Sequence, residues 1–132
     1  MTRITALLTC LALTGCVAAA SPKPVKLGAS FTLAPGASVP LEDSPLRVRF
    51  VAVTEDSRCP SDTTCVWAGE VKVKLEILEA SRLSRELELK SGESAEAAGF
   101  RITLLRVDPM PSSTAQMSAQ GYRATLSADR VH

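Results

Sequence analysis

The chain has 132 residues, of which 45% are apolar and 22% are charged. This length is enough for one small globular domain and too short for a multidomain protein. A disordered chain is also excluded, because the apolar content is too high and the net charge too small. With 15 basic against 14 acidic side chains there is no basic field for nucleic acid, and the one histidine, His132, is the last residue.

Residues 1–15 have the pattern of a secretory signal peptide, with a short positive start followed by an apolar run. The apolar run at 4–14 is about half as long as the roughly 20 residues that a membrane-spanning helix requires. It ends in Leu13-Thr14-Gly15-Cys16, which resembles a lipobox. The resemblance implies cleavage before Cys16 and acylation of that cysteine, so that acyl chains hold the protein on the bilayer.

The residue after this cysteine, Val17, indicates the destination. In the sorting pattern of enteric lipoproteins a residue other than aspartate here implies the outer membrane, with the protein facing the periplasm. The alternative is an ordinary secretory leader cleaved near Ala18 or Ala20. Residues 16–27 contain two prolines and no helical or strand period, which predicts a lipidated cysteine and a flexible tether. Residues 28–132 are then the single β domain.

Alternation of apolar and polar residues predicts strands through this domain. The runs at 31–33 and 39–41 are separated by Ala-Pro-Gly-Ala-Ser, which predicts a hairpin. In the next strand, Leu46, Val48, Phe50 and Ala52 are expected on one face, opposite Arg47 and Arg49. Further strands are expected at 71–77, 86–89, 100–105 and 122–126.

The segment at 76–90 leaves two alternatives open. Ile77, Ala80, Leu83 and Leu87 fall near one helical stripe, whereas Leu87 and Leu89 also alternate with glutamates as in a strand. The strand interpretation is favoured. About seven short strands then predict an antiparallel β-sandwich, immunoglobulin-like or a small open barrel, with one disulfide.

Four cysteines bear on that disulfide. Cys10 leaves with the leader and Cys16 carries lipid, so Cys59 and Cys65 are the remaining pair in an oxidising compartment and should be joined. Closing so short a loop stabilises the fold by about 2 kcal/mol. A redox role is the alternative, but redox pairs have two residues between the cysteines and lie at the start of a helix.

The residues around this pair carry a second resemblance. Asp-Ser-Arg-Cys-Pro at 56–60 and Cys-Val-Trp-Ala-Gly at 65–69 form a pattern similar to the signature of a family of small exported bacterial proteins. The similarity extends more loosely from about Leu46 into the strand after the loop. It implies a disulfide-stapled loop and no particular reaction.

Two interpretations of this loop compete. In the structural one, Trp67 packs into the core or against the disulfide, and Arg58 pairs with Asp56 or Glu55. In the functional one, the stiffened loop is a recognition surface, since tryptophan and arginine are typical of binding hot spots. The candidate binding residues are Asp56, Arg58, Pro60, Asp62 and Trp67.

No cofactor or metal is predicted. Glu55, Asp56, Asp62 and Glu70 bracket the loop but match no calcium motif, and their spacing does not favour a carboxylate pair for glycoside cleavage over solvation. The long connection at 108–120 contains two methionines that suit copper(I), although such residues more often fill gaps against a sheet.

The predicted function is that of a non-enzymatic lipoprotein of the cell envelope, a binding or structural module with the bilayer and an envelope protein as partners. The alternative is an envelope inhibitor of a protease or a wall-degrading hydrolase, using the loop at 58–67 as the inserted segment.

Overall fold

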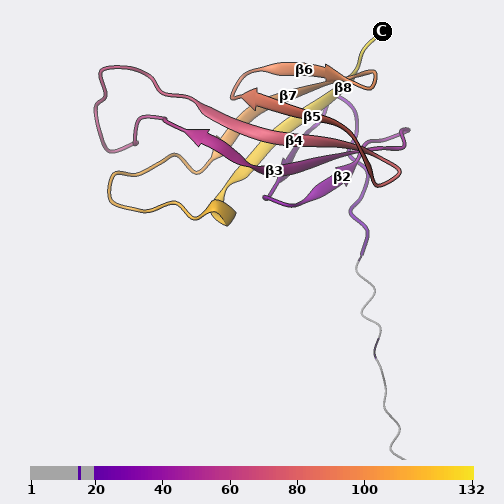
Figure 1. Ribbon diagram of the computed structural model, residues 1–132, viewed down its shortest axis with the longest axis horizontal. Helices are drawn as coiled ribbons and strands as arrows, with labels where there is room; N and C mark the ends of the chain where they lie inside the picture. The colour runs from indigo at the N-terminus through magenta and orange to yellow at the C-terminus, as the bar shows by residue number, and fades with distance from the viewer. Residues whose placement is uncertain (1–14, 16–19) are drawn as a thin grey trace, which may run out of the picture.

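The computed structural model describes residue 15 and residues 20–132, so Cys16 and nearly all of the leader lie outside the described residues. The described chain forms two four-stranded antiparallel sheets, one in the order β1-β8-β7-β6 and the other β2-β3-β4-β5 (Figure 1). The predicted antiparallel β-sandwich is confirmed, and it is open because each sheet has two free edges. The strands are β1 (Ser30–Leu33), β2 (Ser38–Pro40), β3 (Leu46–Asp56), β4 (Val71–Glu79), β5 (Arg82–Lys90), β6 (Ser94–Ala97), β7 (Phe100–Asp108) and β8 (Arg123–Arg130).

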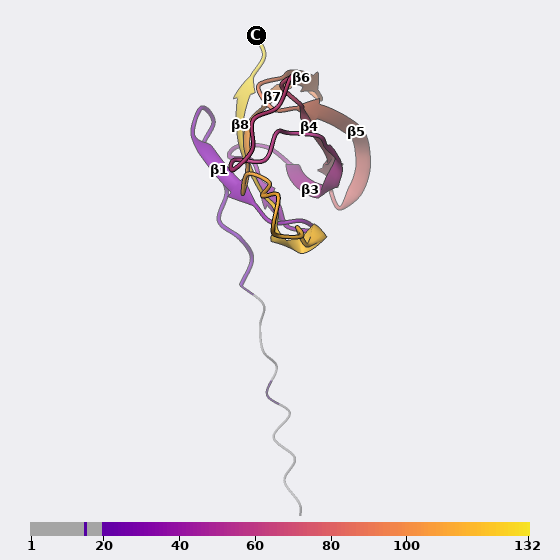
Figure 2. The ribbon, with the colours of Figure 1, turned by 90° about the vertical axis from the view of Figure 1, so that its left-hand side faces the viewer.

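The core lies between the sheets and is entirely apolar in the described part of the chain. Strand β4 shows the reason, because every second residue from Val71 to Ile77 is buried while the lysines and glutamate between them face outward. Phe50 of β3 is the largest fully buried side chain. Viewed from one end, the two sheets curve around this core from opposite sides (Figure 2).

A bulge in β3 corrects one predicted face. Leu46, Val48 and Phe50 are buried as expected, but the pairing with β4 shifts between Phe50 and Ala52. The extra residue reverses the alternation, so that Val53 and not Ala52 packs against the core. The position of such a bulge depends on the pairing with the partner strand, so the local sequence of β3 does not predict it.

The predicted hairpin at 31–33 and 39–41 is wrong. Strand β1 pairs with β8 and β2 pairs with β3, so the two strands belong to different sheets. The connection between them is fixed on β3, where Gly36 N donates to Phe50 O and Phe50 N donates to Ala37 O. This connection therefore crosses from one sheet to the other.

The segment at 76–90 consists of strands, as favoured. Strands β4 and β5 form a hairpin whose two connecting residues, Ala80 and Ser81, both have positive φ, at 48° and 64°. This is the conformation of a two-residue type I′ turn, which matches the twist of the strands. A helix would have required continuous right-handed backbone through these two positions.

The ends of the sandwich differ. At the loop end lie two long loops, the disulfide loop (residues 57–70, after β3) and the second loop (residues 109–122, after β7), both seen at the left of Figure 1. We call the opposite end the turn end, because it carries the tight turns at 80–81 and 98–99. The N-terminal segment also joins the domain there, since Val25 forms a β-bridge with Leu41, shortly before the start of β3. The eleven residues of β3 separate the two ends by about 30 Å. No helix of the described residues is long and apolar enough to cross a membrane.

Candidate functional site

The disulfide loop is closed at its base by Ser57 and Glu70. Ser57 N donates to Glu70 O at 2.8 Å, and Glu70 N donates to the Ser57 hydroxyl at 3.1 Å. Gly69 lies so close that a Cβ atom there would overlap the Ser57 carbonyl. Only glycine therefore fits position 69, and the two arms of the loop run in direct backbone contact.

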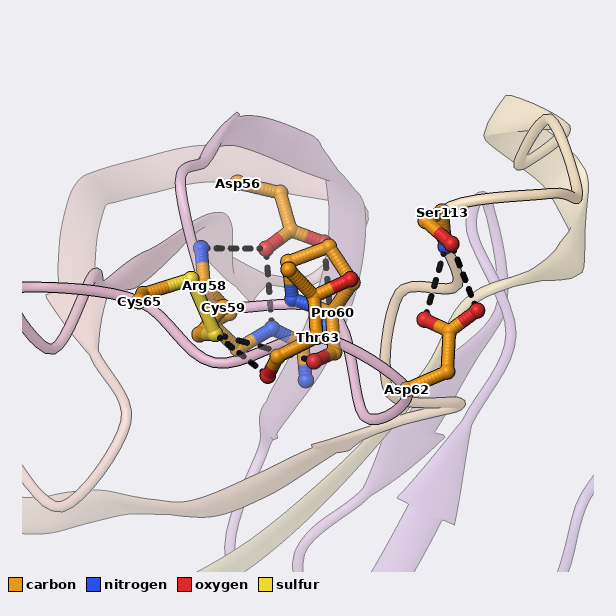
Figure 3. The surroundings of a disulfide bond; sticks show 8 residues. All are labelled: Asp56, Arg58, Cys59, Pro60, Asp62, Thr63, Cys65 and Ser113. Atoms are coloured by element: carbon orange, nitrogen blue, oxygen red, sulfur yellow. Dashed lines mark hydrogen bonds and ion pairs between the residues drawn. A yellow bond between two sulfur atoms is a disulfide. The ribbon is translucent and has the colours of Figure 1, made fainter.

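The predicted disulfide between Cys59 and Cys65 is confirmed (Figure 3). The Cα atoms of the two cysteines lie 5.9 Å apart. Pro60 follows the first cysteine and its carbonyl accepts from Thr63 N at 3.1 Å, which forms the turn at the tip of the ring. The disulfide thus fixes the outer half of the loop, as the backbone bonds at 57 and 70 fix the inner half.

Arg58 connects the two loops. Its guanidinium forms a two-pronged ion pair with Asp56, with Nε to Oδ1 and Nη2 to Oδ2 both at 2.8 Å. The remaining donors reach the end of β7 and the second loop, with Nη1 on Val107 O at 2.7 Å and Nη2 on Pro109 O at 3.1 Å. Because both side chains are only 10% exposed, this geometry positions the loop and leaves no donor directed at solvent.

Asp56 is the acceptor at the centre of this cluster. Burial acts to raise the pKa of its carboxyl, but the hydrogen bonds and charge of Arg58 and the hydroxyl of Tyr122, which donates at 3.0 Å, outweigh it and lower the pKa. Burial, together with this same bond, raises the pKa of Tyr122. Asp56 and Arg58 therefore stay ionised at neutral pH, while the Tyr122 hydroxyl keeps its proton and ties the end of β3 to the residue that precedes β8.

The outer parts of the two loops are also joined. Ser61 N donates to Pro111 O at 3.0 Å, and Asp62 accepts from Ser113, from its backbone N at 3.0 Å and from its hydroxyl (Figure 3). The bonds from Ser113 lower the pKa of Asp62. The disulfide loop and the second loop consequently form one rigid unit at the loop end.

The structure divides the predicted binding residues into two groups. Asp56 and Arg58 are nearly buried and bonded to each other, so their predicted pairing is confirmed. Pro60 forms the turn of the ring, and Asp62 is exposed but bonded to Ser113. Trp67 is 74% exposed and its neighbour Val66 is 95% exposed, so the expectation that the tryptophan packs into the core is wrong. The structural interpretation is therefore confirmed for the pairing of the arginine, and its placement of the tryptophan in the core is wrong.

The carboxylates near the loop are each held by a basic or hydroxyl partner. The pKa of Glu70 is lowered by Lys90 and then by Lys72, as those of Asp56 and Asp62 are lowered by their own donors. None of the three retains a proton at neutral pH, which a general acid must do. Over residue 15 and residues 20–132, no three acidic, histidine or cysteine side chains gather where they could hold a metal.

Sequence reasoning did not identify Tyr122 and Ser113 as parts of this site. Tyr122 was expected only as the start of a strand, and Ser113 only as part of a long connection. Both contact residues of the disulfide loop across more than 50 positions of sequence. No local pattern signals such contacts, because they depend on which strands the fold brings side by side.

The fold and the site define a class: a small open antiparallel β-sandwich with one disulfide-held loop at its end. Compared with family models, with curated proteins and with solved structures, the chain has no significant match. The geometry of the loop end is therefore what points to a function.

Proposed function

We propose that this protein is a membrane-tethered, non-enzymatic binding module of the bacterial cell envelope that presents its disulfide loop to a ligand. The proposal is based on the exposure of Val66 and Trp67 in the disulfide loop. The ion pair of Arg58 with Asp56 and the Cys59–Cys65 disulfide hold this loop in place. Large apolar side chains are normally buried by a stable fold. Here the fold instead holds two of them outside in a fixed position, which lowers the entropy lost on binding.

The placement of the chain ends supports this function. The N-terminal segment joins the domain at Val25, at the turn end, and the exposed pair lies at the opposite end about 30 Å away. A lipid on Cys16 would therefore anchor the protein behind its binding loop. With Val17 following the cysteine, we place the anchor in the outer membrane and the domain in the periplasm.

A non-enzymatic role is proposed because Asp56, Asp62 and Glu70 all lack the raised pKa of a carboxylic general acid. These carboxyls are instead held ionised by their partners. What the loop end offers is a rigid surface with a tryptophan, and this suits recognition.

Two measurements test the proposal. Mass spectrometry of the protein from its native host should find an N-terminal peptide that begins at Cys16 and carries fatty acyl chains. Full-length protein, solubilised in detergent and immobilised, should retain an envelope component that Trp67→Ala loses and that Leu83→Ala retains, because Leu83 is an exposed apolar residue at the turn end.

The outcomes separate the alternatives. An intact initiator methionine overturns the membrane tether, and equal retention by the wild type and Trp67→Ala overturns the binding role of the loop. A one-to-one complex with a protease or wall-degrading hydrolase that blocks its activity would replace the binding module with the inhibitor.

A further inference from the structure

The hairpin of β4 and β5 extends beyond the sandwich at the turn end. Every residue from Glu79 to Glu86 is exposed, although Ile77 on β4 and Leu87 on β5 are buried. The other sheet therefore covers neither face of residues 79–86, here called the ribbon. The ribbon contains the turn at 80–81 and lies at the end of the sandwich that the N-terminal segment joins (Figure 1).

The ribbon places an apolar side chain between two basic ones. Leu83 is 56% exposed, and Arg82 and Arg85 lie within two positions of it. In the described part of the chain, neither arginine forms an ion pair, whereas Glu86 is paired with Lys74. Such a segment suits the headgroup layer of a phospholipid bilayer, because leucine enters the apolar part while guanidinium groups bond to phosphates.

The N-terminal segment adds positive charge at the same end. Between positions 16 and 41 the sequence has two lysines, Lys23 and Lys26, and no acidic residue. Glu79 on the ribbon and the acidic residues at 42–43, in the turn before β3, offset part of this charge. Attraction to phosphates therefore supports a contact with the bilayer, and burial of Leu83 is needed to complete it.

The proposed lipid on Cys16 would keep the ribbon near a bilayer. Val25, which joins the sandwich at the turn end, follows Cys16 by nine positions, which span at most about 30 Å. The loop end lies about 30 Å farther from this attachment point, at the other end of β3. A contact too weak to bind a membrane alone becomes effective when a tether holds it at a local concentration of about millimolar.

We propose that the ribbon rests in the phospholipid headgroup layer, with Leu83 in its apolar part and Arg82 and Arg85 on lipid phosphates. The inference rests on the proposed membrane tether and adds a second, non-covalent contact with the same bilayer. The two attachments together fix the orientation of the domain, so that the disulfide loop points away from the membrane.

The test uses the full-length protein, matured in its native host and reconstituted into vesicles of phosphatidylethanolamine and phosphatidylglycerol with brominated acyl chains. Bromine quenches tryptophan fluorescence at short range. The sole tryptophan, Trp67, reports on the loop end and should keep its fluorescence. Leu83→Trp in a Trp67→Phe background reports on the ribbon, and its fluorescence should fall roughly twofold relative to vesicles without bromine.

Two further variants separate a fixed orientation from the affinity of an added tryptophan for membranes. Leu105→Trp in the same background is the matched control, because Leu105 is 45% exposed on β7 outside the ribbon, and it should not be quenched. Adding Arg82→Glu and Arg85→Glu to the ribbon probe should roughly halve its quenching, since the phosphate contacts are lost.

The outcomes distinguish this inference from the tether on which it rests. Protein that does not float with the vesicles overturns the tether and the ribbon contact together. If the protein floats but position 83 is quenched no more than position 105, or if Trp67 of the wild type is quenched, the ribbon contact is overturned and the tether stands. Unchanged quenching after replacement of both arginines overturns their contact with phosphates.

Discussion

The two ends of the sandwich are held by different means. At the turn end, strands are joined by two-residue turns, such as 80–81 and 98–99, whose backbone conformation alone sets the geometry. At the loop end, long loops are held by a disulfide, an ion pair and side-chain bonds. A fold needs only the first kind of connection to be stable, so the second indicates a region whose shape serves another purpose.

The exposed apolar residues show the same contrast. Val66, Trp67 and Met110 lie in the two long loops, whereas Leu105 lies within β7 and Leu83 beside a tight turn at the other end. The loops thus combine rigid attachment with exposed apolar side chains. If this contrast is correct, substitutions at the loop end should cause large and specific losses, and those at the turn end small changes.

The largest effect is expected from Gly69→Ala. The added methyl group would overlap the Ser57 carbonyl, so the base of the disulfide loop must separate, and the free energy of unfolding should fall by about 3 kcal/mol. Urea denaturation followed by circular dichroism measures this. Gly121→Ala in the second loop is the matched control, since its nearest neighbour would be Met117 Sδ at 3.8 Å, and it should be tolerated. Equal losses in both variants would contradict the close contact at Gly69.

Arg58→Ala should follow. It leaves the Asp56 carboxylate, which is 10% exposed, without its main partner and frees the second loop, which should reduce stability by about 2–3 kcal/mol. Arg58→Lys should recover less than half of this loss, because an ammonium cannot make the two-pronged contact. The control is Arg101→Ala, which breaks an ion pair with Glu96 whose side chains are 54% exposed and should change stability little. If the two arginine variants behave alike, the cluster at Arg58 does not hold the loops.

The pH dependence of stability gives a second view of this cluster. In the folded protein the pKa of Asp56 is below its ordinary value of 3.8, so its contribution is complete above pH 3.8 and is lost as the pH falls through the folded value. Asp56→Asn should therefore be less stable at pH 7 and should show a shallower fall in stability between pH 4 and pH 2. Denaturation at a series of pH values tests this. An unchanged slope would show that Asp56 is not held ionised by Arg58.

The sequence predicted those parts of the molecule that local pattern determines. The strand β4 was expected because its alternation is complete, and the Cys59–Cys65 disulfide because no other pair remained. The partner of β1 and the bulge near Ala52 could not be predicted, since both depend on strands distant in sequence. For Trp67, the sequence left a packed side chain and an exposed recognition residue as alternatives, and only the structure shows that it is exposed.

Removing the disulfide should have an intermediate effect. Cys59→Ser with Cys65→Ser releases a short ring and should reduce the free energy of unfolding by about 2 kcal/mol, while the strands keep their order. Amide exchange measured by NMR should increase in residues 59–68 and stay unchanged in the turn at 80–81. Because the arms of the loop remain joined at Ser57 and Glu70, the loss should be confined to the outer half. Faster exchange throughout both sheets would show that the disulfide supports the whole fold.

The smallest effect is expected at the turn end, and it has the opposite sign. Ala98 has a φ of 52° and precedes Gly99 at 82°, which is a two-residue turn in which asparagine fits the first position better than alanine. Ala98→Asn should therefore raise the free energy of unfolding by about 0.5–1 kcal/mol. The same substitution at Ala68, an exposed residue of the disulfide loop without positive φ, is the control and should not stabilise. Because Ala98 lies at the turn end, its replacement should leave ligand binding at Trp67 unchanged. A change in binding would mean that the two ends are coupled through the sheets, and the separation between a supporting end and a recognising end would be lost.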